Sequence, residues 1–129
     1  MTHQSSFTIM VERVRKGEQL QLERANLIDR ETEMEHWRSN ARLLAEEIKE
    51  ARWELESGKK GATKKLKELE DRLDYANMKF ANMQTRFNEV KHSVGVLENS
   101  LADLELQWFD AHEREKNERQ LTKERGHAR

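Results

Sequence analysis

Side chains able to bind metals or transfer protons are plentiful in this chain, but none falls into a recognised catalytic spacing. The histidines lie far apart and lack a second ligand at a spacing such as His-Glu-x-x-His; they are His3, His36, His92, His112 and His127. The segment Gly58-Lys-Lys-Gly61 lacks the length of a phosphate-binding loop and its serine or threonine after lysine. A catalytic carboxylate needs a concave pocket that excludes water, which a thin coiled coil does not provide. We therefore predict no catalytic residue, no cofactor, no metal site and no enzymatic activity.

A cluster of lysines is the sharpest local charge feature; its members are Lys59, Lys60, Lys64, Lys65 and Lys67. One interpretation is that they are solvated and paired with neighbouring glutamates. The other is a basic tip that meets an anionic surface, such as an acidic protein tail, nucleic acid or phospholipid. No aromatic residue alternates with the lysines, and the formal net charge is −1, so nucleic-acid binding is disfavoured.

Helices must position these side chains, because the apolar residues follow a helical repeat. From Leu66 to Ala111 an apolar residue recurs at alternating steps of three and four, at Leu66, Leu69, Leu73, Ala76, Phe80, Met83, Phe87, Val90, Val94, Leu97, Leu101, Leu104, Trp108 and Ala111. A weaker repeat runs through Leu20, Leu27, Met34, Trp37, Ala41, Leu44, Ile48, Ala51 and Leu55, with Glu23 and Arg30 at two of its core positions. Such seams require a partner helix along their length. The sequence predicts an all-α, elongated coiled coil.

The connection between the two seams admits two architectures. Leu55 and Leu66 are eleven residues apart, which fits either a stutter in one continuous helix of a parallel coiled coil or the tip of an antiparallel helical hairpin. Gly58 suits the end of a helix and Thr63 the N-cap of the next one. The g positions are mainly acidic in the first half and basic in the second, and antiparallel packing brings these two rows together. We favour the hairpin, with predicted pairs between Glu54 and Arg72, Glu47 and Lys79, Arg52 and Glu70, and Glu31 and Lys91.

This interpretation divides the chain into five segments. Residues 1–17 form an N-terminal segment, partly ordered or a short helix, because Met10, Val11 and Val14 are out of phase with Leu20. Residues 18–57 form the first coiled-coil helix, 58–62 the turn, and 63–111 the second helix. Residues 112–129 are a charged tail that we expect to fray, since nothing in it buries a helix.

Several apolar residues lie off the seam. Trp53 and Leu106 fall at f positions and Phe109 at a b position, all of which a two-helix coil leaves in water. Around Leu101–Phe109 the apolar arc also widens. Either a third helix or another subunit contacts it, or the chain's own Met10, Val11 and Val14 bury it. We favour the first and predict a partner-binding surface made of Trp53, Leu101, Leu104, Leu106, Trp108 and Phe109.

Composition limits the function further. The 129 residues are 35% hydrophobic and 38% charged, which is typical of a coiled coil and too polar for a compact core. Cysteine is absent, which fits an intracellular protein, and we identify no targeting or membrane-spanning segment. The stretch Leu69–Phe80, followed by Arg86–Asn88, resembles coiled-coil subunits of ciliary axonemes, a likeness that assigns no functional residue.

We expect a structural protein of the cytoplasm or cytoskeleton that binds coiled-coil or other helical partners, as a homo- or hetero-oligomer, within a scaffold-type assembly. One alternative is a parallel dimerisation module or spacer. Another is a regulatory adaptor that presents the lysine-rich tip to an acidic ligand.

Overall fold

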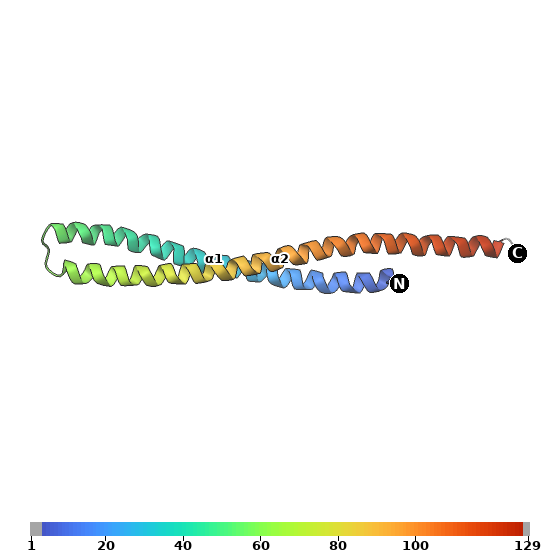
Figure 1. The fold of residues 1–129 in the computed structure, drawn as a ribbon, viewed down its shortest axis with the longest axis horizontal. Helices are drawn as coiled ribbons and strands as arrows, with labels where there is room; N and C mark the ends of the chain where they lie inside the picture. Colours follow the sequence, from blue (N-terminus) through green and yellow to red (C-terminus); the bar gives the residue numbers. More distant parts are fainter. Residues whose placement is uncertain (1–3, 128–129) are drawn as a thin grey trace. The chain divides into compact units, whose positions relative to one another are not determined.

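The chain forms two α-helices, α1 (Ser6–Glu56) and α2 (Ala62–His127), joined by a short turn (Figure 1). The computed structural model describes residues 4–127, and no strand occurs among them. The two helices pack against each other as an all-α helical hairpin. The predicted hairpin is therefore confirmed, and the alternative of one continuous helix in a parallel coil is wrong.

The turn ends α1 through hydrogen bonds that a left-handed glycine permits. Gly58 has a φ of 75°, its N–H donates to the carbonyl of Leu55 at 3.1 Å, and the N–H of Lys59 donates to the carbonyl of Glu54 at 3.0 Å. These are the two bonds of a Schellman motif, in which glycine avoids the steric clash that a Cβ atom causes. Gly58 thus stops the first helix, as the sequence predicts.

The second helix begins one residue earlier than predicted. Gly61 has a φ of 81°, and its carbonyl accepts the N–H of Lys65 at 3.1 Å, so Gly61 takes the N-cap position before Ala62. The expected N-cap, Thr63, lies inside the first turn of α2. Thr63 is a good N-cap by residue type, but Gly61, like Gly58 at the other end of the turn, supplies a left-handed backbone that closes the turn.

Backbone contacts divide the hairpin into two units. The turn unit consists of Ala25–Lys91, and the terminal unit combines Met1–Arg24 with His92–Arg129, of which residues 4–24 and 92–127 are described. In the turn unit a core forms between α1 and α2 from the buried side chains of Leu44, Ile48, Ala51, Leu69 and Ala76. Trp37 packs against this core and meets Tyr75 edge to face, with ring centroids 5.7 Å apart. The seam residues therefore form the core, as their spacing indicates.

In the terminal unit, α1 starts upstream of the predicted boundary. It is continuous from Ser6 through Gly17, so the expected separate segment ending at residue 17 is wrong for the described part, and residues 1–3 lie outside it. The physical reason is Ile9, which is 4% exposed and packs with Leu104 and Ala111. Ile9 lies eleven residues before Leu20. Steps of four, three and four residues connect the two positions, so Ile9 has the same heptad phase as Leu20.

The far end of α2 also extends beyond the predicted limit at residue 111. The helix runs to His127, and Glu115 contacts the start of α1. The backbone N–H and the hydroxyl of Ser6 both donate to the Glu115 carboxylate, the first at 3.0 Å. From Lys116 to Gly126 every residue is exposed, so no described part of the chain covers this stretch of α2.

Candidate interaction surfaces

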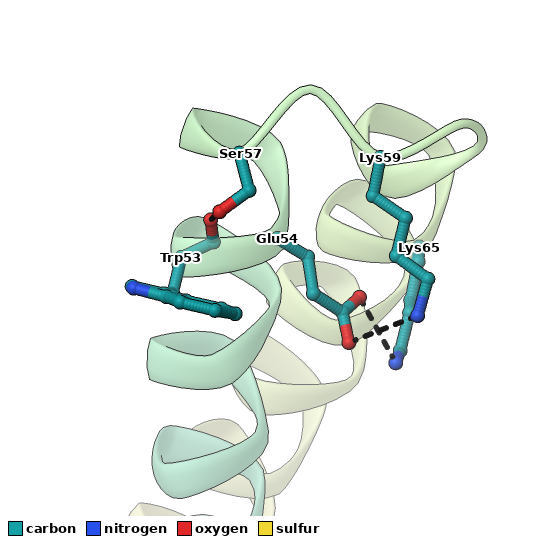
Figure 2. Close-up of polar contacts among 5 residues, drawn as sticks. All are labelled: Trp53, Glu54, Ser57, Lys59 and Lys65. Atoms are coloured by element: carbon teal, nitrogen blue, oxygen red, sulfur yellow. Dashed lines mark hydrogen bonds and ion pairs between the residues drawn. The ribbon is translucent and has the colours of Figure 1, made fainter.

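The lysine-rich tip surrounds one carboxylate at the turn. Glu54 accepts the side-chain amines of Lys59 and Lys65, each at 3.5 Å, and its own side chain is only 20% exposed (Figure 2). Lys59 lies in the turn and Lys65 in the first turn of α2, where positive charge opposes the dipole of the helix start. The Glu54 carboxylate offsets this unfavourable placement. It pairs with Lys65 rather than with the predicted Arg72.

The other predicted ion pairs are realised only in part. Arg52 reaches Glu70 at 4.0 Å, as the antiparallel register requires. Within the described residues, neither Glu47 with Lys79 nor Glu31 with Lys91 comes within ion-pairing distance. A long exposed side chain can pair with any of several nearby partners, and these pairs differ little in energy. The helix register alone therefore does not determine which pair forms.

Three lysines of the tip keep their charge unpaired. Lys60, Lys64 and Lys67 form no ion pair among residues 4–127, and all three are exposed. The tip therefore carries excess positive charge after Glu54 has paired with two of its five lysines.

Trp53 lies beside this tip on the outer side of α1. Its side chain is 69% exposed, and in Figure 2 the ring points away from α2. It borders a shallow surface depression of about 530 Å³, to which Lys49, Ser57 and Lys59 also contribute. Glu50 and Glu54 line the same depression, so the exposed aromatic ring lies among side chains of both charges and is a contact point for apolar groups of a partner.

The second predicted surface, around Leu101–Phe109, divides into an inner and an outer part. Leu104 is 6% exposed and packs with Ile9, and Trp108 packs against the same cluster. Trp108 is further covered by the guanidinium of Arg13, 5.9 Å from its ring centroid, and stacks on His112. These two residues serve the chain's own fold, which corrects their assignment to a partner surface. Their cover comes from Ile9 and Arg13, whereas the alternative had named Met10, Val11 and Val14.

The outer part consists of Leu106 and Phe109, whose side chains are 67% and 59% exposed. Leu101 is half-buried. Leu106 and Phe109 are open to a partner because no segment of the described chain covers them. Their partner-binding role remains a prediction.

A row of exposed apolar residues on α1 lies on the same side of the terminal unit as Phe109. Arg24 and Glu98, both at e positions, pair at 3.5 Å, so the e sides of the two helices face each other in the terminal unit. Phe7, Met10 and Val14 occupy the e and b positions of α1, and Phe7 is 76% exposed. The sequence did signal this row, since these residues are apolar and out of phase with the core.

Carboxylates line the outer side of α2 in the same region. From His92 through Glu113 the chain has no lysine or arginine but has five acidic residues, which are Glu98, Asp103, Glu105, Asp110 and Glu113. Steps of three and four bring Asp103, Leu106, Asp110 and Glu113 into one exposed row, with Phe109 beside it. We call Asp103, Leu106, Phe109, Asp110 and Glu113 the acidic face.

The histidines and carboxylates form no metal-binding group among residues 4–127. His36 meets Trp37 edge to face and His112 stacks on Trp108, so both act as packing partners, and His3 lies outside the described residues. Neither helix contains, within its described residues, a stretch apolar enough to cross a membrane. Comparison with protein-family models, curated proteins and solved structures finds no match to this chain.

Proposed function

We propose that this protein is a non-enzymatic, intracellular structural component that binds partner helices and helps to hold a larger scaffold-type or cytoskeletal assembly together. The observation that carries the proposal is the exposure of Leu106 and Phe109 beside a seam that the chain fills with its own helices. Apolar side chains grouped on a helix surface, rimmed by polar residues, are typical of protein-protein contacts. The exposed Phe7 and Val14 enlarge this surface on α1.

Site-specific photo-crosslinking in the native cell tests the proposal. A photoreactive phenylalanine analogue at Phe109 preserves the ring and its T-shaped contact with Trp108. We expect adducts with another polypeptide, mapped by mass spectrometry to residues spaced by three or four along a helix. The same analogue at Gln120, exposed on the same helix, serves as the control. Equal labelling from both positions, or no adduct from Phe109, would contradict the proposed contact.

A second candidate function is that of an adaptor whose lysine-rich tip binds an acidic protein segment. The observation that favours it is the lack of ion-pairing partners for Lys60, Lys64 and Lys67 in the described chain. Replacing these three lysines by glutamine should abolish a salt-sensitive interaction with a glutamate-rich peptide. The matched control replaces the scattered, exposed Lys91, Lys116 and Lys123, which changes the net charge equally. Unchanged binding in the tip variant would remove the adaptor function.

A further inference from the structure

Exposed apolar side chains of α1 and α2 lie level with each other on one side of the terminal unit. The Arg13 guanidinium covers the Trp108 ring, so the residues that follow these two, Val14 and Phe109, lie at the same height along the helices. Phe7 precedes Val14 by seven residues, about two turns along the same side of α1. Phe7, Val14 and Phe109 are all more than half exposed. A single helix laid along this side can therefore contact apolar side chains of both α1 and α2.

A surface groove continues this side past the start of α1. The groove has a volume of about 1470 Å³, and Phe7, His112 and Lys116 are among the residues that line it. His112 and Lys116 follow Phe109 by three and seven residues, so they lie on the same side of α2. The groove is elongated along α2, because this helix extends beyond the level of Ser6, where α1 begins. An elongated groove that joins an apolar surface suits a helix as its occupant.

Carboxylates border the apolar side chains on both helices. Glu18 lies four residues after Val14 on α1. Glu105 and Glu113 lie four residues before and after Phe109 on α2. Residues four apart are neighbours on a helix surface, so each carboxylate lies beside an apolar contact residue. We call Glu18, Glu105 and Glu113 the rim carboxylates; all three are exposed, and none forms an ion pair within residues 4–127.

The terminal unit offers these carboxylates little positive charge of its own. Arg24, on the same side of α1, is already paired with Glu98 at 3.5 Å, and α2 has no lysine or arginine from His92 through Glu113. Opposite charges across an interface orient association, whereas like charges disfavour it. The rim carboxylates therefore favour a positively charged occupant. They disfavour a second copy of this chain packed symmetrically through the same side.

We propose that a basic amphipathic helix of another protein docks along this side of the terminal unit. Its apolar residues, spaced by three and four, pack on Phe7, Val14 and Phe109, and its lysines or arginines face the rim carboxylates. This inference rests on the proposed function and deepens it, because it states the chemistry of the partner helix.

Two synthetic peptides that differ only in charge test the proposal. Both carry leucine at the a and d positions of a heptad repeat; the basic peptide has lysine at the e and g positions, and the acidic peptide has glutamate there. Each peptide carries a fluorescent dye and is titrated with the purified full chain at low ionic strength, and the fluorescence anisotropy measures binding. We expect the basic peptide to bind and the acidic peptide not to bind, with the binding weakening as salt is added.

A double variant removes the apolar contacts without any change in charge. Phe7→Ala combined with Phe109→Ala should weaken binding of the basic peptide at least about tenfold, because both side chains lie at the centre of the proposed contact. The matched control combines Leu43→Ala with Met78→Ala, which removes two exposed apolar side chains from the turn unit. The control should bind the basic peptide as the wild type does. All four side chains are exposed, so circular dichroism should show unchanged helicity.

A triple variant removes the rim carboxylates and keeps the apolar contacts. Glu18→Gln, Glu105→Gln and Glu113→Gln should together weaken binding of the basic peptide and remove most of its dependence on salt. The matched control changes the net charge equally through exposed glutamates of the turn unit that form no ion pair in the described chain, by Glu31→Gln, Glu68→Gln and Glu89→Gln. This control should retain both the binding and its salt dependence.

Three results would overturn the proposal: a basic peptide that does not bind, an acidic peptide that binds equally well, or binding that survives both the double and the triple variant. Sedimentation velocity of the chain alone adds a fourth. A dimer that the Phe7→Ala and Phe109→Ala variant converts to a monomer would assign this side to a second copy.

The proposed function remains separately testable. If Phe109 forms adducts in the cell with a partner helix that lacks basic residues, and the basic peptide does not bind, helix binding is retained and only the preference for a basic partner is lost.

Discussion

Ser6, the first residue of α1, is bound to Glu115 of α2 by two hydrogen bonds, from its backbone N–H at 3.0 Å and from its hydroxyl at 2.5 Å. The N–H is one of the donors that the start of a helix leaves without an intrahelical partner, so a side chain 109 positions away completes the helix end. Ser5 supports the same turn, since its hydroxyl accepts the N–H of Thr8 at 3.2 Å. Glu115 thereby joins the beginning of one helix to the far part of the other.

The hydroxyl of Ser6 should control the ionisation of Glu115. The side-chain hydrogen bond from Ser6, followed by the backbone one, lowers the pKa of the Glu115 carboxyl below its ordinary value. Replacing Ser6 by alanine removes the larger of these two causes. We expect the titration midpoint of Glu115, followed by carboxyl ¹³C NMR, to rise in Ser6→Ala. Thr8→Ala, which removes a hydroxyl without contact to Glu115, is the control; an equal rise there would contradict the assignment.

The same shift predicts a pH dependence of the first turn of α1. A carboxyl whose folded pKa is lowered stabilises the fold fully above its unfolded pKa, about 4.3, and this contribution disappears as the pH falls through the lowered value. Amide chemical shifts of Ser6 should therefore lose their helical position below that range in the wild type. A first turn that stays equally helical at strongly acidic pH would show that the contact contributes nothing.

Ile9 should anchor the N-terminal part of α1. Its buried side chain fills the space against Leu104 and Ala111, and Ile9→Ala should cost about 2 kcal/mol, the lower end for a buried isoleucine in this two-helix core. Val11 is exposed, and Val11→Ala should change the stability by less than about 0.5 kcal/mol. Amide hydrogen exchange over residues 6–20 measures both effects. Equal protection loss in the two variants would place Ile9 outside the core.

The glycines offer a paired test of the turn. Gly58 has a positive φ, and Gly58→Ala should destabilise the hairpin by about 1 kcal/mol. Gly95 lies within α2, with no atom within 4 Å of an added Cβ, so Gly95→Ala should raise stability by up to about 1 kcal/mol. Thermal unfolding followed by circular dichroism distinguishes the two signs. Two substitutions with the same sign would contradict the hairpin turn.

Glu54 should hold the tip lysines through a salt-sensitive interaction. Glu54→Gln leaves Lys59 and Lys65 without their partner, and we expect a loss of up to about 1 kcal/mol at low salt that nearly vanishes at high salt. Glu56→Gln is the control, because Glu56 forms no ion pair among the described residues. Denaturant titrations at two salt concentrations measure the difference. A loss that is independent of salt would exclude the electrostatic cause.

Local patterns sufficed for much of the fold because helices and their ends depend on near neighbours in the chain. The step of three and four from Leu66 to Ala111 predicted the helical seam, and Gly58 predicted the stop after α1. The acidic and basic g rows favoured the antiparallel hairpin over a continuous helix. Single ion pairs were less predictable, since Glu54 pairs with Lys65 and not with the predicted Arg72. The start of α1 was not predicted because the charged Arg13 and Lys16 occupy the core positions between Ile9 and Leu20.

The sequence by itself determined the helical character of the chain, its turn, and which residues face away from the seam. Only the tertiary structure decided how far the two helices cover each other, because helical periodicity gives the direction of a side chain but not the extent of its partner. The same apolar stretch therefore divides into a covered part and an exposed part. Ile9 and Arg13 cover Leu104 and Trp108 inside the terminal unit, whereas Leu106 and Phe109, on another face of the helix, remain exposed.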